Sequence, residues 1–149
     1  MSSISTAPNG AVCDDRPARC RTVTSLLTRC GFSVSGEVRH YDDLRDLVVR
    51  AAPTLAIVTL PTPGMRGLAA VTGLRAAAPT TELILLSAFG NLEVAAREAG
   101  ALALVSEDDP QALQAVLQAV SRRWHASMAA VVAQRSFGEP ALDIPSSVV

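Results

Sequence analysis

Four polar residues stand where short apolar runs of the sequence end, and together they could form a chemical site. Asp14 and Asp15 follow the first such run, and Thr59 and Ser87 lie at the ends of two later ones. Adjacent carboxylates supply the oxygen ligands that Mg²⁺ prefers in proteins. Without a cation nearby they repel each other, which raises the pKa of one of them. The sequence therefore predicts an acidic pocket that needs a metal ion or an arginine.

Arginines beside this pair are the candidates to neutralise it. Arg16 and Arg66 are both expected on loops next to the pocket. Ser106 or Glu107 ends a further apolar run, so one of them adds another polar side chain to the same place. The acidic pair has two other interpretations. It could be a solvated rim around an inert pocket, or it could cap the following helix, whose N-terminus favours negative charge.

Several common chemistries lack their residues in this chain. All 13 basic residues are Arg, so a Schiff base or a phosphate loop has no lysine. His40 and His125 lie away from Ser87 and Thr59, and a Ser/His/Asp triad therefore has no base. No glycine spacing fits GxGxxG after the first strand. The three cysteines, Cys13, Cys20 and Cys30, form no CxxC pair and are expected to be small buried hydrophobes.

Short apolar runs alternate with amphipathic stretches along the chain. The runs that predict strands are 11–13, 32–38, 55–60, 83–86 and 101–105, and the stretches that predict helices are 17–30, 41–52, 68–77, 91–99 and a last one from Pro110. Strand and helix units joined by short connections indicate a parallel sheet, because parallel neighbours need right-handed crossovers. The fold class is therefore α/β, a doubly wound five-stranded parallel sheet with helices on both faces. Ligands of such folds bind at the carboxyl ends of the strands.

Four landmarks in register carry a resemblance to a known family. They are the acidic pair after the first strand, Leu-Pro-Thr-Pro-Gly-Met-Arg-Gly at 60–67, Leu-Ser-Ala at 86–88 and Ala-Gly-Ala at 99–101. Over residues 11–122 the chain resembles the receiver (CheY-like) domain of two-component response regulators, in the NarL-type branch. The resemblance implies a flavodoxin-like sheet of strand order 2-1-3-4-5. It leaves residues 1–10 and 136–149 as disordered tails and 123–135 as an extension of the last helix.

The chain departs from this family at three positions. Thr59 aligns with the aspartate that accepts the phosphoryl group from a histidine kinase. Glu107, or Ser106 if the alignment shifts by one, aligns with the lysine that pairs with that group. Leu104 aligns with the aromatic switch residue and has no ring or hydroxyl. The resemblance is therefore to a degenerate receiver, a pseudo-receiver without its phospho-acceptor.

The positions that remain are those that bind magnesium and sense the phosphoryl oxygen in the family. They are Asp14 and Asp15 for the metal and Ser87 for the switch hydroxyl. Replacing a third carboxylate by the neutral hydroxyl of Thr59 weakens a magnesium site severely, so we expect a weak or empty one and no other cofactor. Alternatively, Glu107 could supply the third carboxylate.

The function that follows is signal transduction by protein–protein interaction, independent of phosphorylation and with a possible role in regulating transcription. Two alternatives stay open: a regulatory domain that binds a small ligand in the acidic pocket, and a receiver phosphorylated at another carboxylate or at Thr59. No enzyme activity is expected. The formal net charge of -1 and the 27 residues after residue 122 argue against direct nucleic-acid binding. Neither a membrane span nor a signal peptide is recognisable, which predicts a cytoplasmic protein.

The last helix carries an apolar stripe that is longer than the domain needs. Its members recur at three and four positions: Leu113, Val116, Leu117, Val120, Trp124, Met128, Val131 and Val132. A helix that runs to about Gln134 extends roughly 18 Å past residue 122 at 1.5 Å per residue. The stripe either folds back on its own domain or pairs with a second chain or another protein, and we favour pairing.

Overall fold

The computed structural model describes residues 7–143 of the chain, and the side chains of residues 7–134. Its strands are β1 (Asn9–Cys13), β2 (Ser33–Val38), β3 (Leu55–Thr59), β4 (Glu82–Ser87) and β5 (Ala103–Ser106). Its helices are α1 (Pro17–Arg29), α2 (Tyr41–Ala51), α3 (Ala69–Ala77), the short 3₁₀ turn η1 (Gly90–Leu92), α4 (Glu93–Ala99) and α5 (Pro110–Asp143). Each element lies where the apolar pattern predicts it, within a few residues, except at the end of α5.

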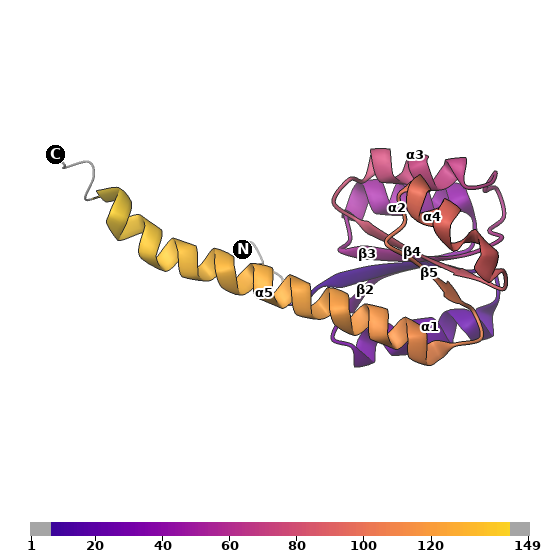
Figure 1. Cartoon of the computed structure of the whole chain (residues 1–149), viewed down its shortest axis with the longest axis horizontal. Coiled ribbons are helices and arrows are strands. Elements are labelled where there is room, and N and C mark those ends of the chain that lie inside the picture. Colours follow the sequence, from indigo (N-terminus) through magenta and orange to yellow (C-terminus); the bar gives the residue numbers. More distant parts are fainter. Residues whose placement is uncertain (1–6, 144–149) are drawn as a thin grey trace.

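The five strands form one parallel sheet in the order β2-β1-β3-β4-β5, which confirms the predicted fold. Helices α1 and α5 cover one face, and α2, α3 and α4 cover the other (Figure 1). The strand order reverses between β1 and β3, so the carboxyl ends of these strands border the crevice where ligands of doubly wound folds bind.

Strand β3 shows how the sequence builds this layered core. Leu55 and Ile57 point to the face under α1 and α5, and Ala56 and Val58 point to the face under α2, α3 and α4. All five residues of the strand are buried. A strand covered on both faces needs a continuous apolar run rather than alternation, and 55–58 is such a run.

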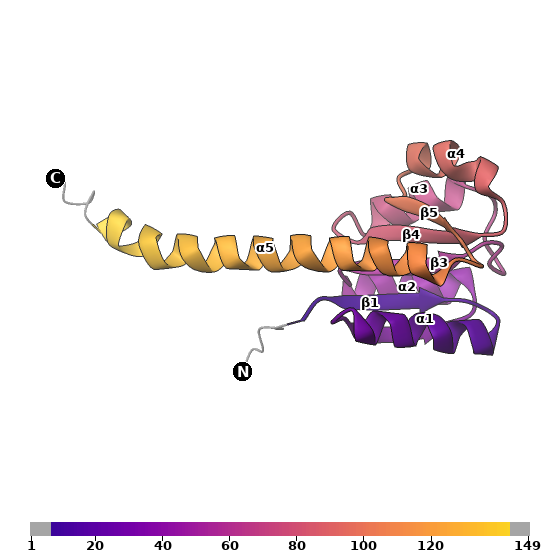
Figure 2. The same ribbon diagram turned by 60° about the horizontal axis from the view of Figure 1, so that its bottom comes forward.

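Helix α5 changes character halfway along its length. Leu113, Leu117 and Val120 are buried against the sheet, so this half of the predicted stripe belongs to the domain's own core. Arg123 then contacts Glu82 at the start of β4, with 3.4 Å between guanidinium nitrogen and carboxylate oxygen. Past this point the helix leaves the sheet and projects away from the amino ends of the strands (Figure 2).

Both predicted tails differ from the structure. Residues 9 and 10 begin β1 instead of belonging to a disordered tail, because Pro8 already accepts a backbone hydrogen bond from Ser33. Helix α5 continues to Asp143, past the end expected at residue 135. Gly138 and Pro140 lower helix propensity but do not alone decide the backbone conformation. The expectations for residues 1–6 and 144–149 lie outside the described residues. Within the described residues, no helix is long and apolar enough to cross a membrane.

Candidate functional site

The residues predicted to form the acidic pocket divide into buried and exposed members. Asp14 follows β1 and is 2% exposed, and Thr59 at the end of β3 is 3% exposed. Asp15, only one residue further along, is exposed. The carboxyl ends of β1 and β3 are neighbours in the sheet, and they bring the Asp14 carboxylate and the Thr59 hydroxyl into direct contact.

The Asp14 carboxylate accepts four hydrogen bonds from three residues, of which the longest, at 3.4 Å, comes from Nη2 of Arg19. The Thr59 hydroxyl donates to one carboxylate oxygen at 2.7 Å, and the Arg19 Nε donates to the same oxygen at 2.7 Å. The backbone N–H of Arg16 donates to the other oxygen at 2.9 Å. Burial by itself raises the pKa of Asp14, but the hydrogen bonds from Arg19, Arg16 and Thr59 outweigh it and hold this pKa below its ordinary value. The carboxylate is therefore ionised, and both of its oxygens accept hydrogen bonds within the protein.

Arg19 links this carboxylate to a second one. Its Nη1 atom lies 3.0 Å from Oε1 of Glu107, directly after β5. The side chains of Arg19 and Glu107 are each 17% exposed, and that of Asp14 is 0% exposed. The hydrogen bond to Asp14 raises the pKa of Arg19 still further above its usual range. One guanidinium thus ties the end of β1 to the loop between β5 and α5.

Of the predicted acidic pair, Asp14 is neutralised by Arg19 and not by the two candidates, Arg16 and Arg66. Arg16 contributes only its backbone N–H, and Arg66 is exposed on the loop between β3 and α3. A signal for Arg19 was present in the sequence. Arg19 precedes Val23 by four residues, which places it in the first turn of α1 on the core side, facing the strand ends.

Asp15 and the capping interpretation can be judged from the same loop. Asp15 borders a shallow cavity of about 210 Å³ together with Arg19 and Glu107. Helix α1 has Arg16 at its N-cap and no side-chain cap hydrogen bond, so neither aspartate caps it in the usual way. Asp14 instead turns the chain by accepting the N–H of Arg16 two residues later.

The remaining predicted positions lie on β4 and β5. Ser87 is buried at the end of β4, and its hydroxyl oxygen accepts the backbone N–H of Phe89 at 2.9 Å. Ser106 pairs with Ser87 in the sheet but is exposed, and it accepts the N–H of Asp108. Leu104 is half-buried against the core cluster under α2, α3 and α4. Of Glu107 and Ser106, only Glu107 reaches the cation beside Asp14.

The oxygen atoms at this site do not form a suitable ligand set for a magnesium ion. Both oxygens of Asp14 already accept hydrogen bonds, and Thr59 offers a neutral hydroxyl whose proton points to Asp14. Across residues 7–134, no three His, Cys, Asp or Glu side chains gather in a metal-binding arrangement. A metal ion at Asp14 would have to displace the guanidinium of Arg19, which already supplies the positive charge.

The cysteines are free thiols in the core. Cys13 and Cys20 are buried and Cys30 is half-buried, and none of them forms a disulfide. Burial raises the pKa of the Cys13 thiol to about 11, and burial also raises the pKa of Cys20 and Cys30. Thiolate is the reactive form, so a raised pKa keeps these thiols in their less reactive form at neutral pH.

Comparison with known proteins places this geometry in a family. Residues 11–118 match the response regulator receiver domain. The receiver domain of a response regulator designated NarL from Mycobacterium tuberculosis is 24% identical with a TM-score of 0.68, over 76% of this chain and 96% of that chain. A CheY-like receiver domain from Methylobacillus flagellatus is also 24% identical with a TM-score of 0.68, over 77% of this chain and 99% of that chain.

A third structure shows the same fold at lower identity. It is the CheX-CheY-BeF3-Mg complex from Borrelia burgdorferi, with 18% identity and a TM-score of 0.66 over 74% of this chain and 87% of that chain. No curated protein matches the sequence. The family match spans most of the chain, and the protein therefore belongs to the response regulator receiver domains, the signalling modules of two-component systems.

Proposed function

We propose that this receiver domain signals without accepting a phosphoryl group at the end of β3. The observation that carries the proposal is the contact between Thr59 and Asp14. A threonine stands at the end of β3, where the family resemblance expects the phospho-acceptor, and its hydroxyl donates to Asp14 at 2.7 Å. A neutral hydroxyl needs a base before it can attack a phosphoryl group. Asp14 is a poor base because its pKa is lowered.

The charge balance of the site supports the same proposal. A receiver that accepts phosphate needs a cation beside the new negative charge, and this chain has no lysine. The guanidinium of Arg19 is engaged by Asp14 on one side and by Glu107 on the other. Arg19 is therefore not free to neutralise an added phosphoryl group, which favours one fixed state of the site rather than a switch.

The projecting half of α5 supports a protein–protein contact as the output. Residues 124–134 contain no Asp, Glu or Arg, and Val131 and Val132 are 44% and 63% exposed. A helix that is apolar around much of its circumference is normally covered. We propose that a second copy of this chain covers the stripe formed by Met128, Val131 and Val132, because the same apolar stripe on two identical helices is self-complementary. A dimer of this kind could then act on a transcription regulator in the cytoplasm.

Intact-protein mass after incubation with acetyl phosphate and magnesium tests the missing phosphoryl transfer. The unmodified chain should keep its mass, while an active receiver domain in the same assay gains one phosphate. Thr59→Asp alone should gain little, because the counter-charge of a lysine is still absent, and Thr59→Asp with Glu107→Lys should gain more. A phosphate mapped to Asp14, Asp15 or Thr59 of the unmodified chain would overturn the proposal.

A further inference from the structure

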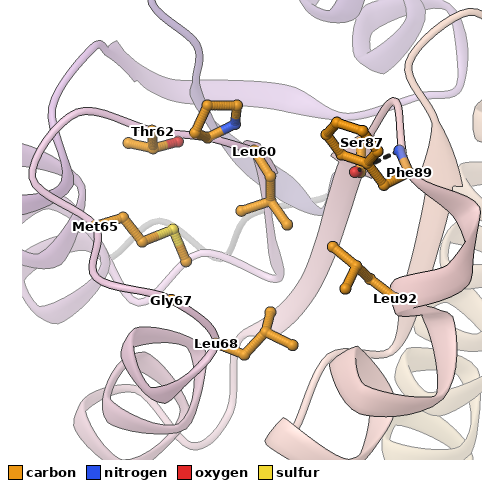
Figure 3. Close-up of a pocket in the computed structure, with 9 residues that line it drawn as sticks. Leu60, Thr62, Met65, Gly67, Leu68, Ser87, Phe89 and Leu92 are labelled. Atoms are coloured by element: carbon orange, nitrogen blue, oxygen red, sulfur yellow. Dashed lines mark hydrogen bonds between the residues drawn. The ribbon is translucent and has the colours of Figure 1, made fainter.

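A second cavity lies beside the acidic site and has a different character. It occupies about 370 Å³ between the loop from β3 to α3 and the loop from β4 to α4. Leu60, Met65, Leu68 and Leu92 converge on it from the two loops, and Phe89 stands at its rim (Figure 3). This volume falls in the range of about 300–1,000 Å³ that is typical of sites for small molecules.

The wall formed by the β3–α3 loop is held in place by contacts outside the cavity. The backbone N–H of Tyr41 donates to the Pro63 carbonyl at 2.9 Å, and the Thr62 hydroxyl donates to the Thr59 carbonyl. Gly64 has a φ of 85° and packs so closely on His40 that a Cβ atom at this position would clash with the imidazole ring. The loop is thus fixed against the start of α2, and the cavity is formed before any ligand arrives.

The polar group best placed in this cavity is the hydroxyl of Ser87. Its oxygen accepts the N–H of Phe89 at 2.9 Å, which leaves the hydroxyl proton able to donate. Ser87 lines the cavity and is 1% exposed, so a ligand must seat its acceptor deeply against the end of β4 to reach this hydroxyl. A buried donor of this kind favours a ligand that brings an acceptor.

This cavity and its neighbour differ in the charge of the residues that line them. The adjacent shallow cavity is lined by Asp15, Arg19 and Glu107, among others. The two cavities share a wall formed by Leu60, Pro61 and Phe89. None of the described residues that line the larger cavity is charged. Placing an ion in such surroundings is costly, so a neutral ligand is favoured.

From this geometry we propose that the cavity binds a small, uncharged and mostly apolar molecule, with one hydrogen-bond acceptor directed at Ser87. Binding would cover Phe89, which is 61% exposed, and would contact both loops at the carboxyl ends of β3 and β4. This inference is independent of the phosphoryl proposal, because no lining residue is Asp14, Arg19 or Glu107.

Fluorescence titration of the full chain with prodan tests the proposal. Prodan is an uncharged naphthalene ketone whose emission moves to shorter wavelength in apolar surroundings. We expect one saturable site per chain. Met65→Gln keeps the side-chain length but puts an amide into the apolar wall, and it should weaken binding about tenfold. Leu92→Trp should fill the space and weaken binding at least tenfold, which checks the site from the opposite loop.

A separate measurement tests the proposed hydrogen bond from Ser87 to the prodan ketone. Ser87→Ala should weaken prodan about fivefold and move the bound emission to shorter wavelength, because the ketone loses its donor. Val94→Gln is the matched control on α4, since Val94 is 69% exposed and does not line the cavity. Val131→Gln is the control for the stripe on α5. The proposal fails if prodan does not saturate, or if Val131→Gln abolishes binding while Met65→Gln and Leu92→Trp leave it unchanged.

Discussion

The acidic site and the projecting half of α5 lie at opposite ends of the sheet. The polar side chains of the acidic site are buried and hydrogen-bonded, whereas the apolar side chains of the projecting helix are exposed to solvent. At the carboxyl ends of the strands, Asp14 is 2% exposed and its carboxylate accepts hydrogen bonds from Thr59, Arg16 and Arg19. Beyond the amino ends, Met128, Val131 and Val132 are 37%, 44% and 63% exposed on a helix that has left the domain (Figure 2).

This difference shows where the molecule can still gain free energy from a partner. A saturated ion pair has little to offer a ligand, because any new contact must first break an existing one. An exposed apolar stripe gains about 25 cal/mol for each Å² of surface that a partner removes from water. We therefore expect substitutions at the acidic site to change the stability of the domain, and substitutions on the stripe to change its association.

Removing the guanidinium of Arg19 should have the largest effect. Arg19→Ala leaves the Asp14 carboxylate buried beside Thr59 without its cation, and breaking a buried ion pair in this way costs about 3 kcal/mol. The free energy of unfolding from urea titration at pH 7 measures the loss. Arg97→Ala is the matched control, because the Arg97–Glu93 pair on α4 is more than half exposed and contributes about 0.4 kcal/mol. Equal losses in the two variants would contradict a structural role for Arg19.

The pH dependence of the same variant sharpens this result. In the folded protein the pKa of Asp14 lies below its ordinary value, so its carboxylate stabilises the fold above the unfolded pKa of about 3.9. That contribution disappears as the pH falls through the folded pKa. In Arg19→Ala the pKa of Asp14 should rise, because burial remains and the guanidinium is gone. The stability difference between the two proteins should therefore shrink below about pH 4, and a constant difference would assign the loss to packing.

Association through α5 should respond to a single charge on the stripe. Val131→Glu places a carboxylate among exposed apolar side chains, and we expect it to weaken a dimer at least tenfold, or about 1.4 kcal/mol. Sedimentation at tens of micromolar measures the change. Val94→Glu is the control, because Val94 is also exposed but lies on α4 and not on the projecting half of α5. If the unmodified chain and Val131→Glu are both monomeric, pairing of two copies is wrong.

The fold could be predicted from local patterns because each pattern has one physical cause. The run from Leu55 to Val58 is apolar throughout because both faces of β3 are covered, and Pro17 and Gly31 mark the two ends of α1. The end of α5 was harder to predict. Gly138 and Pro140 favour a stop near residue 135, but the helix runs past both of them to Asp143.

The site could be predicted only in part, because sequence adjacency does not determine burial. Asp14 and Asp15 look equivalent in the sequence, yet one side of the loop faces Thr59 and the other faces solvent. Arg16 and Arg66 are close to the pair along the chain or in the expected loops, whereas the neutralising side chain is Arg19, one helical turn inside α1. The strand ends pointed to Ser87, but the apolar lining of the cavity beside it could not be predicted, since its two loops meet only in the folded protein.

Magnesium should have the smallest effect of all. Arg19 already lies 2.7 Å from the Asp14 carboxylate, so a metal ion must replace a bound cation and also shed its own water molecules. We expect no saturable heat of binding and no change in melting temperature at millimolar magnesium. Thr59→Asp should create measurable binding, because a second buried carboxylate then adjoins Asp14 and one guanidinium cannot balance both. Asp108→Asn, an exposed acid after β5, should leave the response of the unmodified chain as it is. Saturable binding by the unmodified chain would mean that Arg19 leaves Asp14 readily, and the contrast between a closed site and an open helix would no longer hold.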